Sequence, residues 1–238
     1  ADFHVSSSFG LMDLIVLCKS YLEDLVRIVQ PHYCVSGFRA GGYNIMPSEA
    51  IIGVLTSLGF RYDSSVYAGG YENGILSNFD YRNVSNEFDH WWVNPLDICD
   101  TSFSGNELIE LPIYSIKSRP LNDKVKDIFQ FLIGKRQLSA NTRTNLRARS
   151  RLDMLIFLFR KRCITWDFVM ASRRMNRKVL KRISTGNMNR SFILIGHSKS
   201  IKDIGLVNSF FSELDLFKRK ITFLTLTEVY ENIAKQYK

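Results

Sequence analysis

Three residues whose side chains suit the binding of charged groups or the transfer of protons follow short predicted strands: Arg39, Asp63 and His197. The segments before them are rich in aromatic or β-branched residues, as buried strands are: Tyr33–Phe38, Phe60–Tyr62 and Phe192–Ile195. In α/β proteins, groups just past the carboxyl ends of parallel strands face the ligand crevice. We therefore expect the three side chains to meet at one rim, where the imidazole, which titrates near neutral pH, could transfer a proton.

A strand, loop, helix and strand position the first two of these residues. Gly41-Gly42 open a polar loop after Arg39, and Pro47 suits the first position of a helix. Apolar residues then recur at helical spacing up to Leu58. Gly59 is placed to end this helix in a left-handed cap, directly before the strand that leads to Asp63.

The flanking sequence completes an α/β pattern. Further helices are predicted where apolar residues recur at helical spacing: 11–29 and 204–217. Further strands are predicted where short apolar runs occur: Leu108–Ile113 and Ile221–Leu224. Thr225 and Glu228, three residues apart, form a capping box for a terminal helix.

A long loop after Asp63 is rich in aromatic residues and Gly. Aromatic rings can stack on sugars, and the candidate substrate-binding residues are Tyr43, in the preceding loop, Trp91 and Trp92. The alternative is that these rings pack the loop onto the sheet, which general burial statistics favour.

One segment makes the protein basic. The net charge of the 238-residue chain is +9, whereas residues 117–190 contain 20 Lys or Arg and only 4 Asp or Glu. Two amphipathic stripes within this segment predict a helical insertion. Its charge could meet an acidic glycan, a phosphate-bearing lipid carrier, a membrane surface or nucleic acid. No aromatic residues alternate with the basic ones and no nucleic-acid motif accompanies them, which argues against nucleic acid and for a solvated cationic face.

Composition sets further limits. Aromatic content of 13% and apolar content of 45% fit a globular protein. Four Cys residues lie too far apart for a metal-ligand spacing or a small disulfide framework. No apolar run approaches the ~20 residues of a membrane-spanning helix. The N-terminus shows no signal peptide, so a cytoplasmic and a cell-envelope location both stay open.

Five segments together resemble the polysaccharide deacetylases, metal-dependent carbohydrate esterases that include chitin and peptidoglycan deacetylases. FRAGGY at 38–43 and LGFRYDSSV at 58–66 are similar to the third and fourth motifs of the family. NELIELP at 106–112 is similar to the strand of the family that leads into a Leu-Pro step. FILIGHSKSI at 192–201 is similar to the fifth motif, an apolar strand that ends in His. FLTLTEV at 223–229 is similar to the closing strand and helix of the family. The first two family motifs have no counterpart in this sequence.

This resemblance implies an incomplete, distorted (β/α) barrel with a basic helical insertion. The barrel would occupy 1–116 and 191–238, and the insertion 117–190. The resemblance also implies hydrolysis of N-acetyl or O-acetyl groups on a polysaccharide or oligosaccharide. It implies a divalent metal in the complete enzyme, for which zinc is the first expectation. By motif, His197 would protonate the leaving group, Asp63 would orient His197, and Arg39 would hold the catalytic Asp in its ionised form.

The metal ligands and the catalytic base of the family come from its first two motifs, as an Asp pair and a His pair. This sequence has no adjacent Asp residues, and its four His residues include no pair at i, i+2 or i, i+4 spacing. We therefore predict no metal site and no activity for the chain alone. It could be the C-terminal portion of a deacetylase, a natural remnant or partner subunit that binds glycan without hydrolysing it, or a basic module that binds an anionic partner through 117–190.

Overall fold

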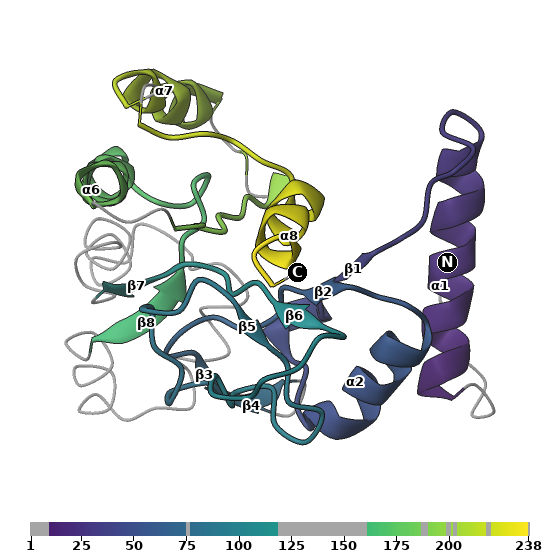
Figure 1. Ribbon diagram of the computed structural model, residues 1–238. Coiled ribbons are helices and arrows are strands. Elements are labelled where there is room, and N and C mark those ends of the chain that lie inside the picture. Colours follow the sequence, from purple (N-terminus) through teal and green to yellow (C-terminus); the bar gives the residue numbers. More distant parts are fainter. Residues whose placement is uncertain are drawn as a thin grey trace, which may run out of the picture. The chain divides into compact units, whose positions relative to one another are not determined.

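The computed structural model describes residues 10–74, 77–118, 161–186, 190–198, 201, 204–217 and 220–237 (Figure 1). The chain divides into two compact units. The first comprises Ala1–Ile113, Asn189–Ile193 and Phe223–Lys238, and the second Tyr114–Met188 and Leu194–Thr222. The predicted division into 1–116, 117–190 and 191–238 stays a prediction, because both amphipathic stripes of the basic segment lie outside the described residues.

The first unit is built on a small, mainly parallel sheet. Its elements are α1 (Leu11–Arg27), β1 (Gly37–Phe38), the 3-10 helix η1 (Gly41–Tyr43), α2 (Ser48–Ser57), β2 (Tyr62–Asp63), β3 (Tyr71–Asn73), β4 (Asn78–Asp80), β5 (Trp91–Trp92), β6 (Ile109–Glu110) and α8 (Leu226–Ala234). The strand order is β1-β2-β6-β5, in which β1, β2 and β6 are parallel and β5 is antiparallel to β6. Strands β3 and β4 form an antiparallel pair. The mixed α/β prediction is confirmed, and the described residues form small sheets without a closed barrel.

Tyr62 joins the sheet to α8. Its ring lies against Gly37 of the neighbouring strand, where a Cβ atom would overlap the ring, so a larger residue at this position would force the Tyr62 ring to shift. The Tyr62 hydroxyl is 3.0 Å from the hydroxyl of Thr227 in α8. The rings of Tyr62 and Tyr230 lie 6.0 Å apart. These contacts hold the C-terminal helix on the strand that carries Asp63.

Helix α1 buries little of its apolar surface. Only Ile15 and Glu23 are buried within it. Its exposed apolar side chains are Leu11, Met12, Leu14, Val16, Leu17, Tyr21, Leu22 and Leu25, and Ile28 and Val29 just after the helix are 79% and 84% exposed. No helix in the described ranges combines the length and the hydropathy needed to span a bilayer.

Glu23 attaches α1 to the segment that leads into β1. Its carboxylate accepts hydrogen bonds from the Val35 backbone N–H at 2.9 Å and from Arg27 at 3.0 Å, and it is also paired with Lys19. Arg27 in turn donates to the Tyr33 carbonyl at 2.9 Å. The Lys19 hydrogen bond, followed by the one from Val35, lowers the pKa of Glu23.

We predict that Glu23→Ala lowers the free energy of unfolding by about 1–2 kcal/mol, because the Val35 N–H loses its partner. Glu23→Gln keeps an acceptor for Val35 and should cost less. Because the pKa of Glu23 is lowered in the folded state, its contribution is present above its unfolded pKa and is lost as the pH falls through the folded value. Urea unfolding followed by circular dichroism measures these effects. Asp24→Ala, on the exposed side of α1, is the control, and an equal loss there would contradict the prediction.

The second unit combines an antiparallel pair of strands with two helices. Its elements are β7 (Ser115–Ser118), β8 (Arg162–Thr165), α6 (Arg173–Thr185) and α7 (Ile204–Asp215), with β7 and β8 antiparallel. Trp166, 2% exposed, lies at its centre, with its ring edge-on to Tyr114 and Phe210 at 6.2 Å. The indole N–H donates to Asn176 Oδ1 at 2.9 Å, so α6 is fixed to the end of β8.

Local predictions from the sequence have mixed outcomes. Gly59 has a φ of 74° after α2, as a left-handed cap requires, and the Thr225/Glu228 capping box is present. Helix α2 begins at Ser48, with Pro47 as its N-cap. The predicted strand Ile221–Leu224 is wrong: this segment forms no strand, because no neighbouring strand pairs with it among the described residues. The predicted strand Phe192–Ile195 forms only single bridges, at Ile193 and Ile195.

Candidate functional site

Asp63 and Glu110 form a buried carboxyl pair in the first unit. They stand opposite each other in the parallel register of β2 and β6, and both are fully buried. Asp63 accepts hydrogen bonds from the Ser65 N–H at 3.0 Å and the Ser65 hydroxyl at 2.8 Å. Glu110 Oε1 accepts from the Val66 N–H at 3.0 Å. The pair therefore fixes the chain just after β2.

The buried environment of this pair favours a protonated carboxyl group. Burial raises the pKa of Glu110 well above its usual value, and the neighbouring charge of Asp63 adds to the increase. Burial also raises the pKa of Asp63, while hydrogen bonds from Glu110 and Ser65 oppose this. No donor among the described residues reaches Glu110 Oε2, so no hydrogen bond stabilises a negative charge on this oxygen. Glu110 was not among the predicted site residues, although a carboxylate in an otherwise apolar strand is a visible signal.

Arg39 binds the loop after β2. Its Nε donates to the Ser64 carbonyl at 2.8 Å and its terminal nitrogen donates to the Ser64 hydroxyl at 2.9 Å. That hydroxyl donates onward to the Leu111 carbonyl at 2.7 Å. Arg39 and Asp63 thus lie at the exits of neighbouring parallel strands, as predicted. Arg39 fixes the loop through Ser64. The expectation that Arg39 holds a catalytic Asp in its ionised form stays a prediction.

The candidate aromatic residues differ in what they could offer a ligand. Trp91 is buried and its indole N–H donates to the Ile98 carbonyl at 2.8 Å, so its ring belongs to the core. Trp92 is half-buried, with its ring edge-on to Tyr237 at 5.7 Å. Tyr43 is half-buried, has a φ of 63° and accepts a hydrogen bond on its carbonyl from the Tyr81 hydroxyl at 2.7 Å. Packing thus accounts for Trp91, and Tyr43 and Trp92 stay candidates.

His197 is paired with Asp167 in the second unit. Imidazole Nδ1 lies 2.5 Å from Asp167 Oδ2, and the His197 side chain is 40% exposed whereas that of Asp167 is 7% exposed. The other carboxylate oxygen of Asp167 accepts hydrogen bonds from the N–H groups of Val169 and Met170 at 2.9 and 3.1 Å. A carboxylate held in this way orients the imidazole. The orienting role that the resemblance implies for Asp63 stays a prediction.

The backbone around Trp166 positions this His–Asp pair. The Ile195 N–H donates to the Trp166 carbonyl at 3.2 Å, and the Phe168 N–H donates to the Ile195 carbonyl at 3.0 Å. These bonds form a parallel bridge between Asp167 and Ile195, two residues before His197. Gly196 lies so close to the Phe168 ring that a Cβ atom there would overlap it. Asp167 was missed because only this long-range pairing identifies its partner.

The predicted site residues fall into both units. Arg39, Asp63, Tyr43, Trp91 and Trp92 belong to the first unit and His197 to the second. Their convergence on one rim stays a prediction. Within the described ranges, the structure brings together two other sets: Asp63 with Glu110, and His197 with Asp167.

Neither set fits the divalent metal that the resemblance implies. The described residues include no group of three or more His, Cys, Asp or Glu side chains that could hold a metal ion. Burial raises the pKa of both carboxyl groups in the first unit, which disfavours the ionised form that a metal needs, and the His–Asp pair offers two ligands at most. The chain matches no protein-family model, no curated protein and no solved structure.

Proposed function

We propose that the chain is part of a hydrolase that resembles the polysaccharide deacetylases, and that its second unit supplies the group that protonates the leaving amine or alkoxide. The observation that carries this proposal is the pair of His197 and Asp167. A buried carboxylate holds one nitrogen of a partly exposed imidazole, so Nε2 is the nitrogen that can give a proton to a leaving group.

An incomplete (β/α) barrel is part of the same proposal. The parallel order of β1, β2 and β6 supports it. So do the parallel bridges from Tyr67 to Ile113 and from Ile113 to Ile193, which continue the parallel pairing beyond β6. In the described part of the chain β1 pairs with β2 alone, so its outer edge could receive another strand.

The substrate that this proposal implies is an N-acetyl or O-acetyl group on a glycan. The chain does not present a metal site among its described residues, so we derive no step through a metal. What its residues can do is orient the imidazole and hold a proton near the leaving group. We therefore expect the chain by itself to bind acetylated glycan and to release no acetate.

We predict that an N-acetylglucosamine oligomer shifts the imidazole NMR signals of His197 in the full chain, whereas those of the exposed His32 stay unchanged. Asp167→Asn should weaken this binding about tenfold, because a charge-assisted hydrogen bond no longer orients the ring. A carboxylate can only accept from Nδ1, whereas an amide can also donate to it, so the same change should weaken any preference for a proton on Nδ1. The matched control is Asp89→Asn. Asp89 pairs with His90 at 3.0 Å and accepts from the Ser191 N–H at 2.9 Å, so among the His residues its replacement should alter the signals of His90 and leave those of His197 unchanged.

Acetate release from acetylated oligomers, with and without added zinc, completes the test. Turnover that His197→Ala abolishes would contradict the expected inactivity while supporting the role of His197. If neither N-acetylated nor O-acetylated oligomers change the signals of His197, the proposed function is wrong.

A further inference from the structure

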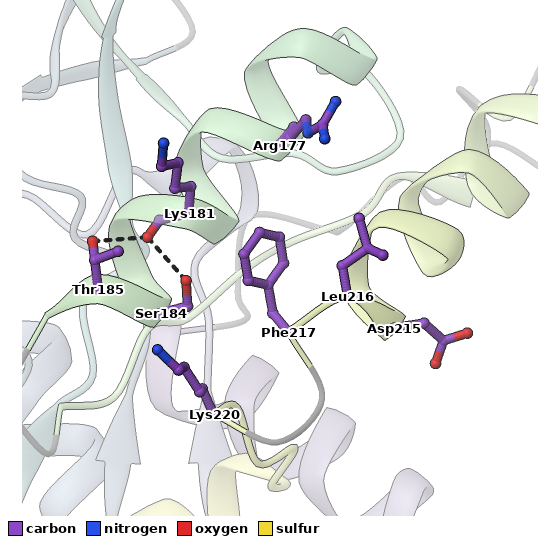
Figure 2. Close-up of a pocket in the computed structure, with 8 residues that line it drawn as sticks. All are labelled: Arg177, Lys181, Ser184, Thr185, Asp215, Leu216, Phe217 and Lys220. Atoms are coloured by element: carbon purple, nitrogen blue, oxygen red, sulfur yellow. Dashed lines mark hydrogen bonds between the residues drawn. The ribbon is translucent and has the colours of Figure 1, made fainter.

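A cavity of about 690 Å³ lies between α6 and the C-terminal end of α7 in the second unit. Its volume falls within the ~300–1,000 Å³ that is usual for small-molecule sites. Figure 2 shows the side chains that line this α6/α7 cavity: Arg177, Lys181, Ser184, Thr185, Asp215, Leu216, Phe217 and Lys220. Three of them are basic and one is acidic, and the Asp215 carboxylate points away from the other side chains in this view.

Glu213 is the counter-charge for two arginine side chains of α6, one of which lines the cavity. Arg173, Arg177 and Lys181 follow one another at four-residue spacing on α6, so like charges lie one turn apart, which is unfavourable without a counter-charge. Glu213, buried in α7, accepts a hydrogen bond from Arg173 at 2.9 Å and lies 3.3 Å from Arg177 Nε. The Glu213 carboxylate therefore neutralises Arg173 and Arg177 and holds α6 against α7.

Lys181 and Lys220 have no such carboxylate. Neither ammonium group forms an ion pair with any residue in the described ranges. Both line the cavity, and both are exposed, so a ligand can reach them from solvent. Two unpaired cations beside Arg177 favour an anionic group, for which phosphate and carboxylate are the usual partners of Lys and Arg.

The remaining lining matches a sugar ring. Phe217 and Leu216 offer apolar surface, and Figure 2 shows the Phe217 ring between the α6 side chains and Leu216. The hydroxyls of Ser184 and Thr185 donate to the Lys181 carbonyl at 3.0 and 2.9 Å. Their oxygens can then accept hydrogen bonds from ligand hydroxyls. An aromatic face with hydroxyl acceptors suits a saccharide, whose C–H face is apolar and whose hydroxyls donate.

We infer that the α6/α7 cavity binds a saccharide that carries a phosphate or carboxylate group. Lys181 and Lys220 bind the anionic group, Phe217 packs against the sugar ring, and Ser184 and Thr185 accept from its hydroxyls. This inference goes beyond the proposed hydrolase function and uses neither His197 nor Asp167.

Calorimetric titration of the full chain tests it with four probes: glucose, glucose 6-phosphate, glucuronate and inorganic phosphate. We expect at least one of the two anionic sugars to bind about tenfold or more tightly than both glucose and phosphate, and the stronger of the two identifies the anionic group. Lys181→Gln and Lys220→Gln should each weaken that binding about five- to tenfold, as the loss of a charge-assisted hydrogen bond would. Phe217→Leu should weaken binding of the sugar and leave that of phosphate unchanged.

The matched control is Lys178→Gln. Lys178 is an exposed cation of the same helix that does not line the cavity, so binding should change less than about twofold. An equal loss in Lys178→Gln would show that general charge, and not this cavity, binds the ligand. Tighter binding of an oligonucleotide with the same charge, or no binding of either anionic sugar, would also overturn the inference. If acetylated glycan leaves the His197 signals unchanged while the anionic sugars still bind as expected, the proposed function is wrong and the inference about the α6/α7 cavity stands.

Discussion

A rise in pH from about 5 to about 9 should destabilise the folded chain by on the order of a few kcal/mol, and Glu110→Gln should remove most of this loss. Glu110 is fully buried beside Asp63, and burial followed by the charge of Asp63 raises its pKa in the folded protein. The unfolded chain releases this proton near the usual carboxyl pKa of about 4.3. Between the unfolded and the folded pKa the native state binds more protons, so its stability falls as the pH rises.

Glutamine keeps the hydrogen bonds of this site without the titration. Its carbonyl oxygen can accept from the Val66 N–H, and its amide can donate to Asp63 as the protonated acid does. The unfolding free energy of Glu110→Gln should therefore change little across the same pH range. Urea unfolding at a series of pH values measures the difference.

Glu107→Gln is the matched control for this experiment. Glu107 lies three residues earlier in the same segment and is exposed, so its replacement should leave the pH profile of the native chain in place. Parallel pH profiles for the native chain and Glu110→Gln would mean that the buried pair does not hold its proton in the way proposed.

Trp166→Ala should lower the free energy of unfolding of the second unit by about 3–5 kcal/mol. The side chain is 2% exposed, packs between Tyr114 and Phe210 and donates to Asn176. Removal leaves a cavity and an unpaired buried acceptor. Because the Trp166 carbonyl also receives the Ile195 N–H, the position of His197 relative to Asp167 should loosen at the same time.

Trp166→Phe separates packing from hydrogen bonding. It keeps an aromatic ring between the same neighbours but leaves Asn176 Oδ1 unpaired, which should cost about 1–3 kcal/mol. Ile164→Ala, on the half-exposed β8 strand, is the control and should cost less than either. Urea unfolding followed by circular dichroism gives the stabilities, and the His197 imidazole signals report the His–Asp pair. A Trp166→Ala variant as stable as Ile164→Ala would contradict this account of the core.

Local features of the fold could be predicted because neighbouring residues carry their signal. The turn after α2 needs a positive φ, which only Gly59 in that stretch adopts freely, and the capping box joins residues three positions apart. The run Ile221–Leu224 was misread, because a short apolar segment becomes a strand only where another strand is free to pair with it.

The chemistry of the candidate site depends on long-range pairing, which spacing does not reveal. Asp167 reaches His197 because a single parallel bridge joins Asp167 to Ile195, and Glu110 meets Asp63 because β6 adds to β2 in one register. The sequence alone indicated the strand exits at Arg39 and Asp63, and it placed His197 after a segment that forms only single bridges. It could not indicate which carboxylate serves which partner, since that follows from the order of strands in the sheet.

The sparse packing of α1 determines how this helix separates from the sheet. Most of its apolar side chains are already hydrated in the folded state, so undocking exposes little additional apolar area. The heat-capacity change of unfolding and the dependence of the unfolding free energy on urea both scale with newly exposed surface. Both quantities should therefore be small for the separation of α1 from the sheet. Acid should act more strongly than heat or urea, because protonation of Glu23 removes the one charged group that ties the helix to the Val35 amide.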